Sequence, residues 1–249
     1  MTQLARFGAD CDNGAVLTQN RPAAVLWDFD GTVADTEPLW IASQIEVMAS
    51  YQVSYSYQQA AALCGVSSEV SIQSLFDAYE QQRGERPQFS GDELWGQVLD
   101  GVIRRLNQEP LPWRPGAKEL LDELGHEGVP MALVSASERR MIDAALAKMP
   151  HGIFEVVIAG NEMPKSKPAP DSYLLAAERL SVRAGDCIVV EDSIYGTEAG
   201  RAAGAAVIAV PCMQELGNYP GQIVIPSLAG VDLGRLREIW HETKEVVYE

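Results

Sequence analysis

Residues 23–32 read AAVLWDFDGT, an apolar run that passes directly into two aspartates, Asp28 and Asp30, and then into Gly31. Side chains of a strand alternate between its faces, so the two aspartates share one face only while the chain stays extended. Gly31 then allows the backbone to turn. We expect both carboxylates to point into a crevice at the carboxyl end of a parallel strand, where open α/β sheets bind ligands. The pair suggests covalent phosphoryl chemistry, in which one carboxylate attacks and the other handles the proton.

Length, composition and charge narrow the class of protein. The 249 residues are enough for one large domain, or for a core domain with a smaller partner. Hydrophobic residues make up 47% and charged residues 22%, which argues against disordered, fibrous and membrane classes. A net charge of −16 disfavours nucleic acid and anionic membranes as partners. It leaves room for a small phosphorylated metabolite, because a local positive site with a bound metal can override the global field.

The cysteines and the N-terminus indicate a cytoplasmic protein. No two cysteines form a CxxC pair, and free thiols in a reducing compartment are the simplest interpretation of Cys11, Cys64, Cys187 and Cys212. Residues 1–20 lack the apolar region of a signal peptide. No run reaches the roughly 18 apolar residues of a membrane span.

The chain divides into three expected segments. Residues 1–21 have weak periodicity and form an N-terminal extension. In residues 38–110 the apolar positions recur at helical spacing and no strong strand pattern occurs, which predicts an all-helical inserted domain. The proline-rich stretch 109–116 breaks helix and returns the chain to the core. The core domain therefore comprises residues 22–37 and 111–249.

Helix and strand patterns alternate after residue 116. The expected helices cover 117–126, 139–148, 171–180 and 196–203, and the expected strands cover 130–134, 156–159, 187–190 and 206–210. Such alternation predicts βα units and a parallel sheet, so the fold class is α/β with a Rossmann-like core. The first strand, within 23–27, belongs to this sheet.

Three later segments supply what the paired carboxylates lack. Ser135 follows the strand at 130–134 and can donate a hydrogen bond to a phosphate oxygen, supported by backbone N–H groups at the start of the next helix. Lys167 offers a cation in a loop that prolines keep from becoming helical. Lys165 competes with Lys167 for the role of binding phosphate. Glu191 and Asp192 end another apolar strand and suit a hard cation such as Mg²⁺.

These segments resemble the four motifs of the haloacid dehalogenase superfamily, in its phosphatase and phosphomutase branch. The resemblance covers residues 23–210, and the run from Asp28 to Glu37, DFDGTVADTE, is similar to the first motif almost without a break. The helical insert resembles the C1 cap of that family. The stretch between Ser135 and Lys167 is too short for the larger C2 cap.

The resemblance implies a role for each motif residue. Asp28 would attack phosphorus and form an aspartyl phosphate, and Asp30 would protonate the leaving oxygen and then activate water. Mg²⁺ would be held by Asp28, the backbone carbonyl of Asp30 and Asp192, with Glu191 contributing directly or through water. Phosphate oxygens would be bound by Ser135, Ala136 and Lys167.

The resemblance leaves two main reactions and one non-catalytic alternative open. Asp30 argues against dehalogenation, because the dehalogenases of this superfamily lack that aspartate. A phosphatase is favoured over a phosphosugar mutase like beta-phosphoglucomutase, since Trp40 and Ser68 stand where that mutase has a histidine and an arginine. A binding protein without catalysis would be marked by loss of a motif residue, and none is lost.

The helical insert is expected to set specificity. Candidate substrate contacts near its hinge and loop are Glu37, Trp40, Gly65, Ser68 and Ser71. A sugar phosphate, a phosphoglycolate-like acid and a nucleoside monophosphate all fit this pattern.

Overall fold

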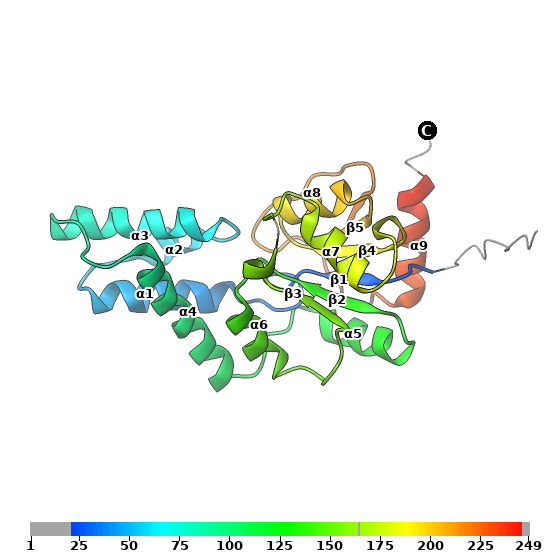
Figure 1. Cartoon of the computed structure of the whole chain (residues 1–249), viewed down its shortest axis with the longest axis horizontal. Coiled ribbons are helices and arrows are strands. Elements are labelled where there is room, and N and C mark those ends of the chain that lie inside the picture. Colours follow the sequence, from blue (N-terminus) through cyan, green and yellow to red (C-terminus); the bar gives the residue numbers. More distant parts are fainter. Residues whose placement is uncertain (1–20, 164, 246–249) are drawn as a thin grey trace, which may run out of the picture.

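A computed structural model describes residues 21–163 and 165–245, so the predicted N-terminal extension, apart from Arg21, and Cys11 lie outside the described residues (Figure 1). The described chain contains a six-stranded parallel sheet in the order β3-β2-β1-β4-β5-β6. Its strands are β1 (Val25–Trp27), β2 (Met131–Val134), β3 (Val156–Ile158), β4 (Ile188–Glu191), β5 (Ala206–Ala209) and β6 (Gln222–Val224). The predicted α/β class with a parallel core is confirmed.

The central position of β1 brings distant motifs to one edge of the sheet. In register, Trp27 lies beside Leu133 of β2 and Val190 of β4. Because all three strands run in the same direction, the residues that follow them meet at the carboxyl edge. Asp28 therefore meets Ser135 and the Glu191–Asp192 pair, which lie more than 100 residues later in the chain.

Helices cover both faces of the sheet. On one face lie α5 (Ala117–His126), α6 (Arg139–Leu146) and α9 (Leu233–Glu245), which pack against Val25 and Trp27. On the other lie α7 (Asp171–Arg179) and α8 (Ile194–Ala202), which pack against Leu26. The strands are thus buried on both faces, as their continuous apolar runs require.

The helical insert consists of α1 (Glu37–Ser50), α2 (Tyr57–Ala61), α3 (Ser68–Arg83) and α4 (Gly91–Gln108), which lie to one side of the sheet (Figure 1). Serine N-caps begin three of these helices, at Ser56, Ser67 and Ser90. The insert has its own hydrophobic core, which includes Ile41, Met48, Leu75 and Leu94.

Helix α4 belongs to both cores. Its first half contributes Leu94 and Val98 to the core of the insert, while Leu99 and Leu106 join the core of the sheet. An isolated β-bridge between Ala34 and Trp113 joins the two connecting segments through which the chain enters and leaves the insert. The insert is therefore held to the sheet by a shared helix as well as by its connections.

The sequence patterns located most elements within a few residues but missed two. The helix predicted over 117–126 is α5 with the same bounds, and the strand predicted within 23–27 begins only at Val25. Strand β6 and helix α9 were not predicted. The apolar run at β6 is short and ends at Pro226. Helix α9 follows Asp232, whose Oδ1 accepts from the Arg235 backbone as an N-cap does, and carries Leu233, Leu236 and Trp240 at helical spacing, so its signal was available in the sequence.

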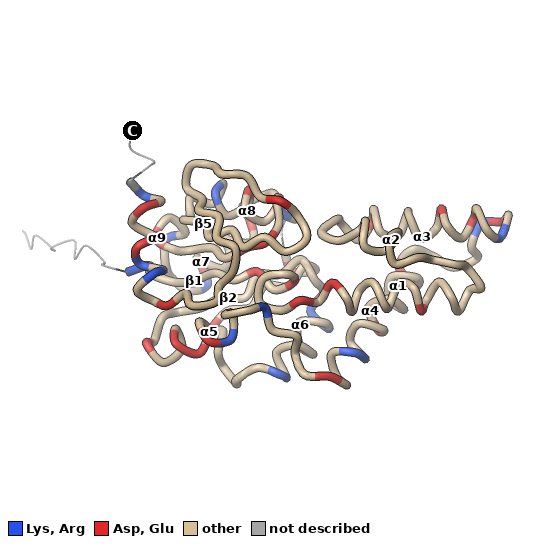
Figure 2. Tube along the Cα trace, turned by 180° about the vertical axis from the view of Figure 1, so that it is seen from behind, with Lys and Arg blue, Asp and Glu red and all other residues tan. Residues whose placement is uncertain are grey.

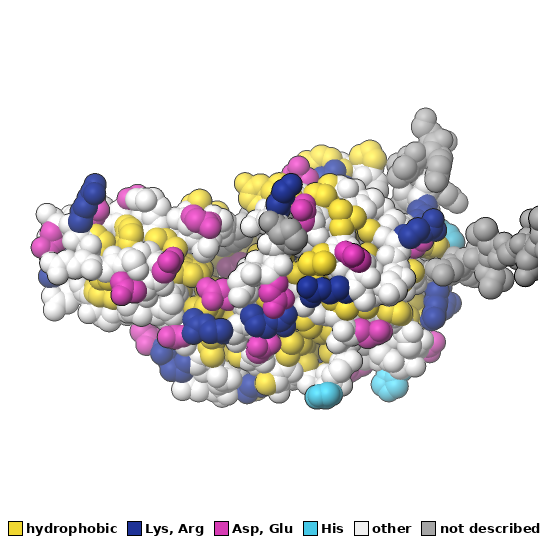
Figure 3. Space-filling view, in the orientation of Figure 1, with side chains coloured by type: hydrophobic (Ala, Val, Ile, Leu, Met, Phe, Trp, Pro, Cys, Tyr) yellow, Lys and Arg dark blue, Asp and Glu magenta, His cyan; other side chains and the backbone are white. Residues whose placement is uncertain are grey.

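Charges of both signs are interspersed along the described chain (Figure 2). The space-filling view likewise shows Lys and Arg side chains next to Asp and Glu on the visible face (Figure 3). Many of them are paired, as in the contacts of Arg104 and Arg105 with Glu46 and of Arg139 with Glu162. Within residues 21–163 and 165–245, no helix is both long and apolar enough to cross a membrane.

Candidate active site

The turn after β1 passes close to Asp192 at Gly31. Gly31 has a φ of +82°, a left-handed conformation that side-chain-bearing residues avoid. A Cβ at this glycine would overlap the carboxylate of Asp192. Glycine is therefore required both by the backbone conformation and by the close approach of the second acid.

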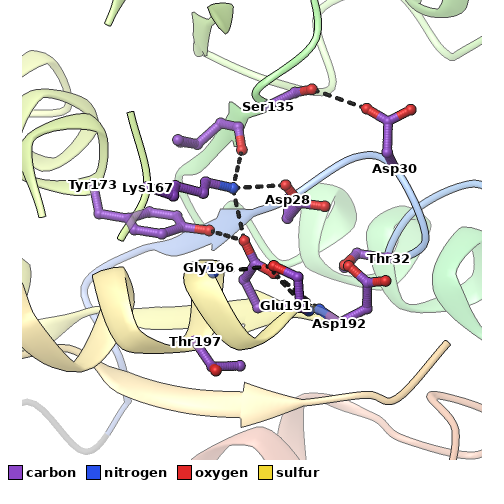
Figure 4. Close-up of polar contacts among 12 residues, drawn as sticks. Asp28, Asp30, Thr32, Ser135, Lys167, Tyr173, Glu191, Asp192, Gly196 and Thr197 are labelled. Carbon is purple, nitrogen blue, oxygen red and sulfur yellow. Dashed lines mark hydrogen bonds and ion pairs between the residues drawn. The ribbon is translucent and has the colours of Figure 1, made fainter. Parts of the chain in front are cut away.

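Lys167 lies between the acids at the carboxyl edge (Figure 4). Its Nζ lies 2.7 Å from Asp28 Oδ1, 2.7 Å from Glu191 Oε1 and 3.1 Å from the carbonyl oxygen of Val134. The side chain is only 7% exposed. Burial lowers the pKa of Lys167, but the two carboxylates outweigh burial and hold the pKa well above its usual value. Lys165, by contrast, is exposed.

Glu191 is fully buried and its carboxylate oxygens are already occupied by donors. In addition to Lys167, Oε1 accepts a hydrogen bond from the Tyr173 hydroxyl at 2.9 Å. Oε2 accepts from the backbone N–H of Asp192 at 3.0 Å and from the backbone and hydroxyl of Ser193 at 3.1 and 3.0 Å. Glu191 is thus arranged to fix Lys167 and the turn that carries Asp192.

Asp28, Glu191 and Asp192 form an acidic cluster in which one oxygen of each lies within 4.8 Å of the others. Burial, followed by the charge of Glu191, raises the pKa of Asp28. Burial, followed by the charge of Asp28, raises the pKa of Asp192. Thr32 donates to one oxygen of Asp192 at 3.2 Å. A hard divalent cation fits the carboxylates of Asp28 and Asp192, because it would relieve the repulsion among three clustered acids, of which only Asp28 and Glu191 contact Lys167.

Asp30 has a different set of partners, although it lies two residues from Asp28. Its Oδ1 accepts hydrogen bonds from the Thr36 hydroxyl at 2.6 Å and from Trp40 Nε1 at 3.3 Å. Its Oδ2 accepts from the hydroxyls of Ser135 at 3.1 Å and Ser137 at 2.7 Å. Figure 4 shows the carboxylate turned toward Ser135 rather than toward Lys167.

Two of the predicted phosphate-binding residues lie in the loop after β2. Ser135 is fully buried, and its hydroxyl contacts Asp30 while it accepts a hydrogen bond from the Ser137 backbone at 2.9 Å. Ala136 is exposed. Its carbonyl oxygen lies so close to Gly160 that a Cβ there would overlap it. This loop is therefore packed tightly on one side and open on the other.

The candidate contacts in the insert lie in different environments. Glu37 is half-buried, and its pKa is raised chiefly by burial. Gly65 has a φ of +75°, and a Cβ there would lie 2.8 Å from Nε2 of Gln214, so the loop of the insert faces the segment after β5. Ser68 is half-buried at the start of α3, whereas Ser71 is buried within the insert.

Sequence patterns alone did not single out several residues that hold this site in place. Tyr173 and Ser193 anchor Glu191, and Thr36 and Ser137 bind Asp30. Tyr173 occupies an apolar helical position that is typical of core aromatics. The Ser-x-Ser pattern at Ser135 and Ser137, directly after a strand, was the sequence signal that could have indicated Ser137 as a second hydroxyl donor.

Comparison with known proteins identifies the family of this chain. A sequence model of the haloacid dehalogenase-like hydrolases matches residues 25–210. The fructose-1-phosphate phosphatase YqaB of Escherichia coli is 31% identical over 193 residues, which cover 76% of this chain and 97% of that protein. Hexitol phosphatase B of Escherichia coli is 30% identical over 227 residues, which cover 89% of this chain and 96% of that protein.

Solved structures share the fold. A crystal structure of CbbY from Rhodobacter sphaeroides in complex with phosphate superimposes with a TM-score of 0.74 at 23% identity, and covers 86% of this chain and 99% of that one. A structure of a beta-phosphoglucomutase from Clostridium difficile gives a TM-score of 0.70 at 20% identity, with 90% of this chain and 99% of that one covered. The predicted resemblance is confirmed, and the chain belongs to the haloacid dehalogenase-like hydrolase family.

Proposed function

We propose that this protein is a Mg²⁺-dependent phosphatase that hydrolyses a small phosphorylated metabolite through an aspartyl phosphate on Asp28. The observation that carries the proposal is the buried contact of Lys167 with both Asp28 and Glu191 at the carboxyl edge of the sheet. A lysine held between two acids can bind phosphoryl oxygens beside a carboxylate that attacks phosphorus.

The contacts of Asp28 support a role as the nucleophile. Only its Oδ1 is engaged by Lys167, and none of the described residues donates to its Oδ2. The free oxygen would attack phosphorus in line while Lys167 offsets the charge on the transferring group. Because burial raises the pKa of Asp28, further positive charge is needed to keep this carboxylate ionised.

The acidic cluster supports a metal site made from Asp28, Asp192 and the backbone carbonyl of Asp30. Bound Mg²⁺ supplies that positive charge and neutralises charge on the phosphoryl oxygens. Glu191 would act through Lys167 and through the turn at Asp192 rather than as a free ligand, since its two oxygens already accept five donor contacts.

Asp30 would serve as the general acid and base. In the present arrangement its carboxylate faces Ser135 and Ser137, so it must turn toward the ester oxygen to deliver a proton. The same movement would free the Ser135 hydroxyl to donate to a phosphoryl oxygen. After transfer, the ionised Asp30 would activate the water that hydrolyses the aspartyl phosphate.

We further propose that residues 38–110 act as a cap on a core formed by residues 22–37 and 111–249. The separate hydrophobic core of the insert supports this division, and α4 links the two parts. Gly65 lies close to Gln214, so a loop of the insert lies opposite the segment that follows β5. Such a cap would exclude water and select the substrate.

The names of the relatives indicate which substrates to test first. Two relatives of about 30% identity are named as phosphatases of fructose 1-phosphate and of hexitol phosphates. We therefore propose hexose and hexitol monophosphates as the leading substrate class. Trp40 and Ser68, in place of the histidine and arginine of beta-phosphoglucomutase, favour hydrolysis over transfer to a second sugar.

The test is release of inorganic phosphate from a panel of phosphorylated metabolites in the presence of Mg²⁺, with Asp28→Asn as the control. We expect release by the wild type and none by Asp28→Asn. If the wild type releases no phosphate but isomerises a hexose phosphate with a bisphosphate primer, the protein is a mutase. If it does neither, the proposed catalysis is wrong.

A further inference from the structure

The loop that follows β2 is held in place by the loop that follows β3. The backbone N–H of Ser135 donates to the carbonyl oxygen of Ile158 at 3.0 Å. In the opposite direction, the backbone N–H of Gly160 donates to the carbonyl oxygen of Ser137 at 2.8 Å. A Cβ at Gly160 would overlap the carbonyl oxygen of Ala136, so glycine is needed for this close approach. The two loops therefore pack as one unit at the carboxyl edge of the sheet.

Arg139, the first residue of α6, joins the same two loops through its side chain. Its Nε donates to Glu162 Oε1 at 2.9 Å, and its Nη2 donates to Glu162 Oε2 at 2.6 Å. The same Nη2 donates to the carbonyl oxygen of Val157 at 3.0 Å. Exposed ion pairs contribute little, but the Arg139 and Glu162 side chains are only 30% and 31% exposed. Because the guanidinium contacts both carboxylate oxygens, the pair has a defined geometry as well as opposite charges.

The start of α6 is capped from the loop that follows β3. Glu138 occupies the N-cap position, but its side chain makes no capping hydrogen bond within the described residues. Asn161 Oδ1 instead accepts a hydrogen bond from the backbone N–H of Arg139 at 3.1 Å. A side-chain oxygen in this place satisfies one of the N–H groups that a helix leaves free at its start. The path of the chain from β2 into α6 therefore depends on residues of a different loop.

This unit carries donors that can bind a phosphoryl group. Within the described residues, the backbone N–H of Ala136 has no hydrogen-bond acceptor, and this residue is exposed. The segment that leaves Glu162 leads to Lys167, whose Nζ donates to the carbonyl oxygen of Val134 at 3.1 Å. Val134 is the last residue of β2. The position of the free N–H relative to the lysine therefore depends on how the two loops are joined.

We propose that Arg139 and Glu162 are positioning residues that fix the loop at 135–137 relative to Lys167. This role rests on the proposed function, in which that loop and Lys167 bind the transferring phosphoryl group. The two side chains act through the backbone of the loops rather than by contact with the substrate. Without their ion pair, the loop at 135–137 would keep its backbone contacts but lose the side-chain contact that fixes its distance from the lysine. Small displacements of such donors weaken binding of the phosphoryl group.

Binding of inorganic phosphate in the presence of Mg²⁺ tests this role without any turnover. Glu162→Ala removes the contact with the Arg139 guanidinium and should raise the Kd of phosphate, measured by isothermal titration calorimetry, by about 5- to 10-fold. The same variant should lower kcat/KM for phosphate release by about tenfold. The factor should be the same for a hexitol phosphate and for 2,4-dinitrophenyl phosphate, because the loop binds the phosphoryl group and not the leaving group.

Asp143 provides a matched control on the same arginine. Its Oδ1 lies 3.6 Å from Arg139 Nη1 within α6, and its side chain is exposed. Asp143→Ala therefore removes a negative charge beside Arg139 without touching the loop that follows β3. We expect this variant to keep the wild-type Kd of phosphate and the wild-type kcat/KM.

A double variant and a milder variant keep the test decisive. Arg139→Ala with Glu162→Ala should bind phosphate as weakly as either single variant, because the two side chains form one contact. If Glu162→Ala fails to fold, Asn161→Ala removes the cap of α6 and should also raise the Kd of phosphate.

The free energy of unfolding, measured in urea, separates positioning from a merely structural role. A Glu162→Ala variant that is less stable but binds phosphate with the wild-type Kd would overturn the positioning role. Failure of the wild type to release phosphate from either ester would instead overturn the proposed function.

Discussion

The ammonium group of Lys167 lies 2.7 Å from a carboxylate oxygen of Glu191, which is itself fully buried. Asp28 shares the same ammonium group at the same distance. Desolvation makes such a cluster costly unless every charge is paired and hydrogen-bonded. The other contacts of Glu191, from Tyr173 and from the turn at Asp192 and Ser193, provide that pairing.

Lys167 and Lys165 give a matched pair of substitutions. Lys167→Gln removes the buried cation from Asp28 and Glu191 and should lower kcat by about 100-fold or more, because charge on the transferring oxygens is no longer offset. Lys165 is exposed, and Lys165→Gln should retain wild-type kcat. Steady-state phosphate release measures both. Loss of activity in the Lys165 variant, with activity kept in the Lys167 variant, would reverse the assignment of the two lysines.

Tyr173→Phe tests whether Glu191 must be held in place. The substitution removes the hydroxyl that donates to Glu191 Oε1 at 2.9 Å. A lost hydrogen bond to a buried charge should lower the free energy of unfolding by about 1.5 to 3 kcal/mol. Displacement of Lys167 should lower kcat by about tenfold. Urea unfolding and phosphate release provide the two measurements.

Tyr55→Phe is the control for this variant. Among the described residues, its hydroxyl bonds to Ser74 alone, at 3.2 Å within the helical insert, so the substitution should leave kcat unchanged. If Tyr173→Phe is as stable and as active as the wild type, Glu191 does not depend on the tyrosine.

Gly31→Ala separates backbone strain from damage to the site. Gly31 and Gly204 have φ values of +82° and +79°, so an alanine at either position should cost about 1 to 2 kcal/mol of stability. The new Cβ would overlap Asp192 at Gly31, whereas at Gly204 it would have no atom of the described residues within 4 Å. We expect Gly31→Ala to weaken Mg²⁺ binding and turnover while Gly204→Ala affects stability alone. Equal Mg²⁺ affinity in the two variants would argue against a metal ligand at Asp192.

The acidic cluster predicts that stabilisation by Mg²⁺ depends on pH. Burial raises the pKa values of Asp28 and Asp192 in the folded protein, so the metal-free folded state holds more protons than the unfolded state. Its stability therefore falls as the pH rises above the unfolded-state values of about 4. Metal binding requires the ionised carboxylates. The Mg²⁺-induced rise in Tm should therefore be larger at about pH 8 than at about pH 5.

Asp192→Asn is the control for the metal experiment. It removes one carboxylate from the cluster and should abolish most of the Mg²⁺-induced rise in Tm at both pH values. A rise in Tm that is the same at both pH values, or that persists in this variant, would place the metal elsewhere.

The sequence predicted the sheet and the motifs well because both depend on local patterns. Apolar runs at β1, β2 and β4 identified strands, and the parallel order placed Asp28, Ser135 and Glu191 at one edge. The orientation of Asp30 could not be predicted in this way. It is fixed by Trp40 from one helix and by Ser135 and Ser137 from a loop more than 100 residues away, which only the folded chain brings together.

The partners of Glu191 were hidden from the sequence for a related reason. Tyr173 lies on the buried face of α7, and only the packing of α7 against the sheet directs its hydroxyl to the carboxylate. Edge strand β6 was missed because its apolar run is short and ends at Pro226, whereas β3, an edge strand of the same length, continues into a fourth apolar residue, Ala159. The predicted boundary of the insert also fell one residue inside α1, which begins at Glu37.

The nucleophilic role of Asp28 is tested most directly by trapping the phosphoryl-enzyme. In Asp30→Asn the base that activates water is lost, while 2,4-dinitrophenyl phosphate still transfers its phosphoryl group without an acid. Rapid acid quenching, proteolysis and mass spectrometry would then locate the modification. We predict one phosphoryl group on Asp28, which hydroxylamine removes and which Asp28→Asn lacks. Continued turnover without a modified Asp28, or a phosphoryl group on another residue, would contradict the proposed mechanism.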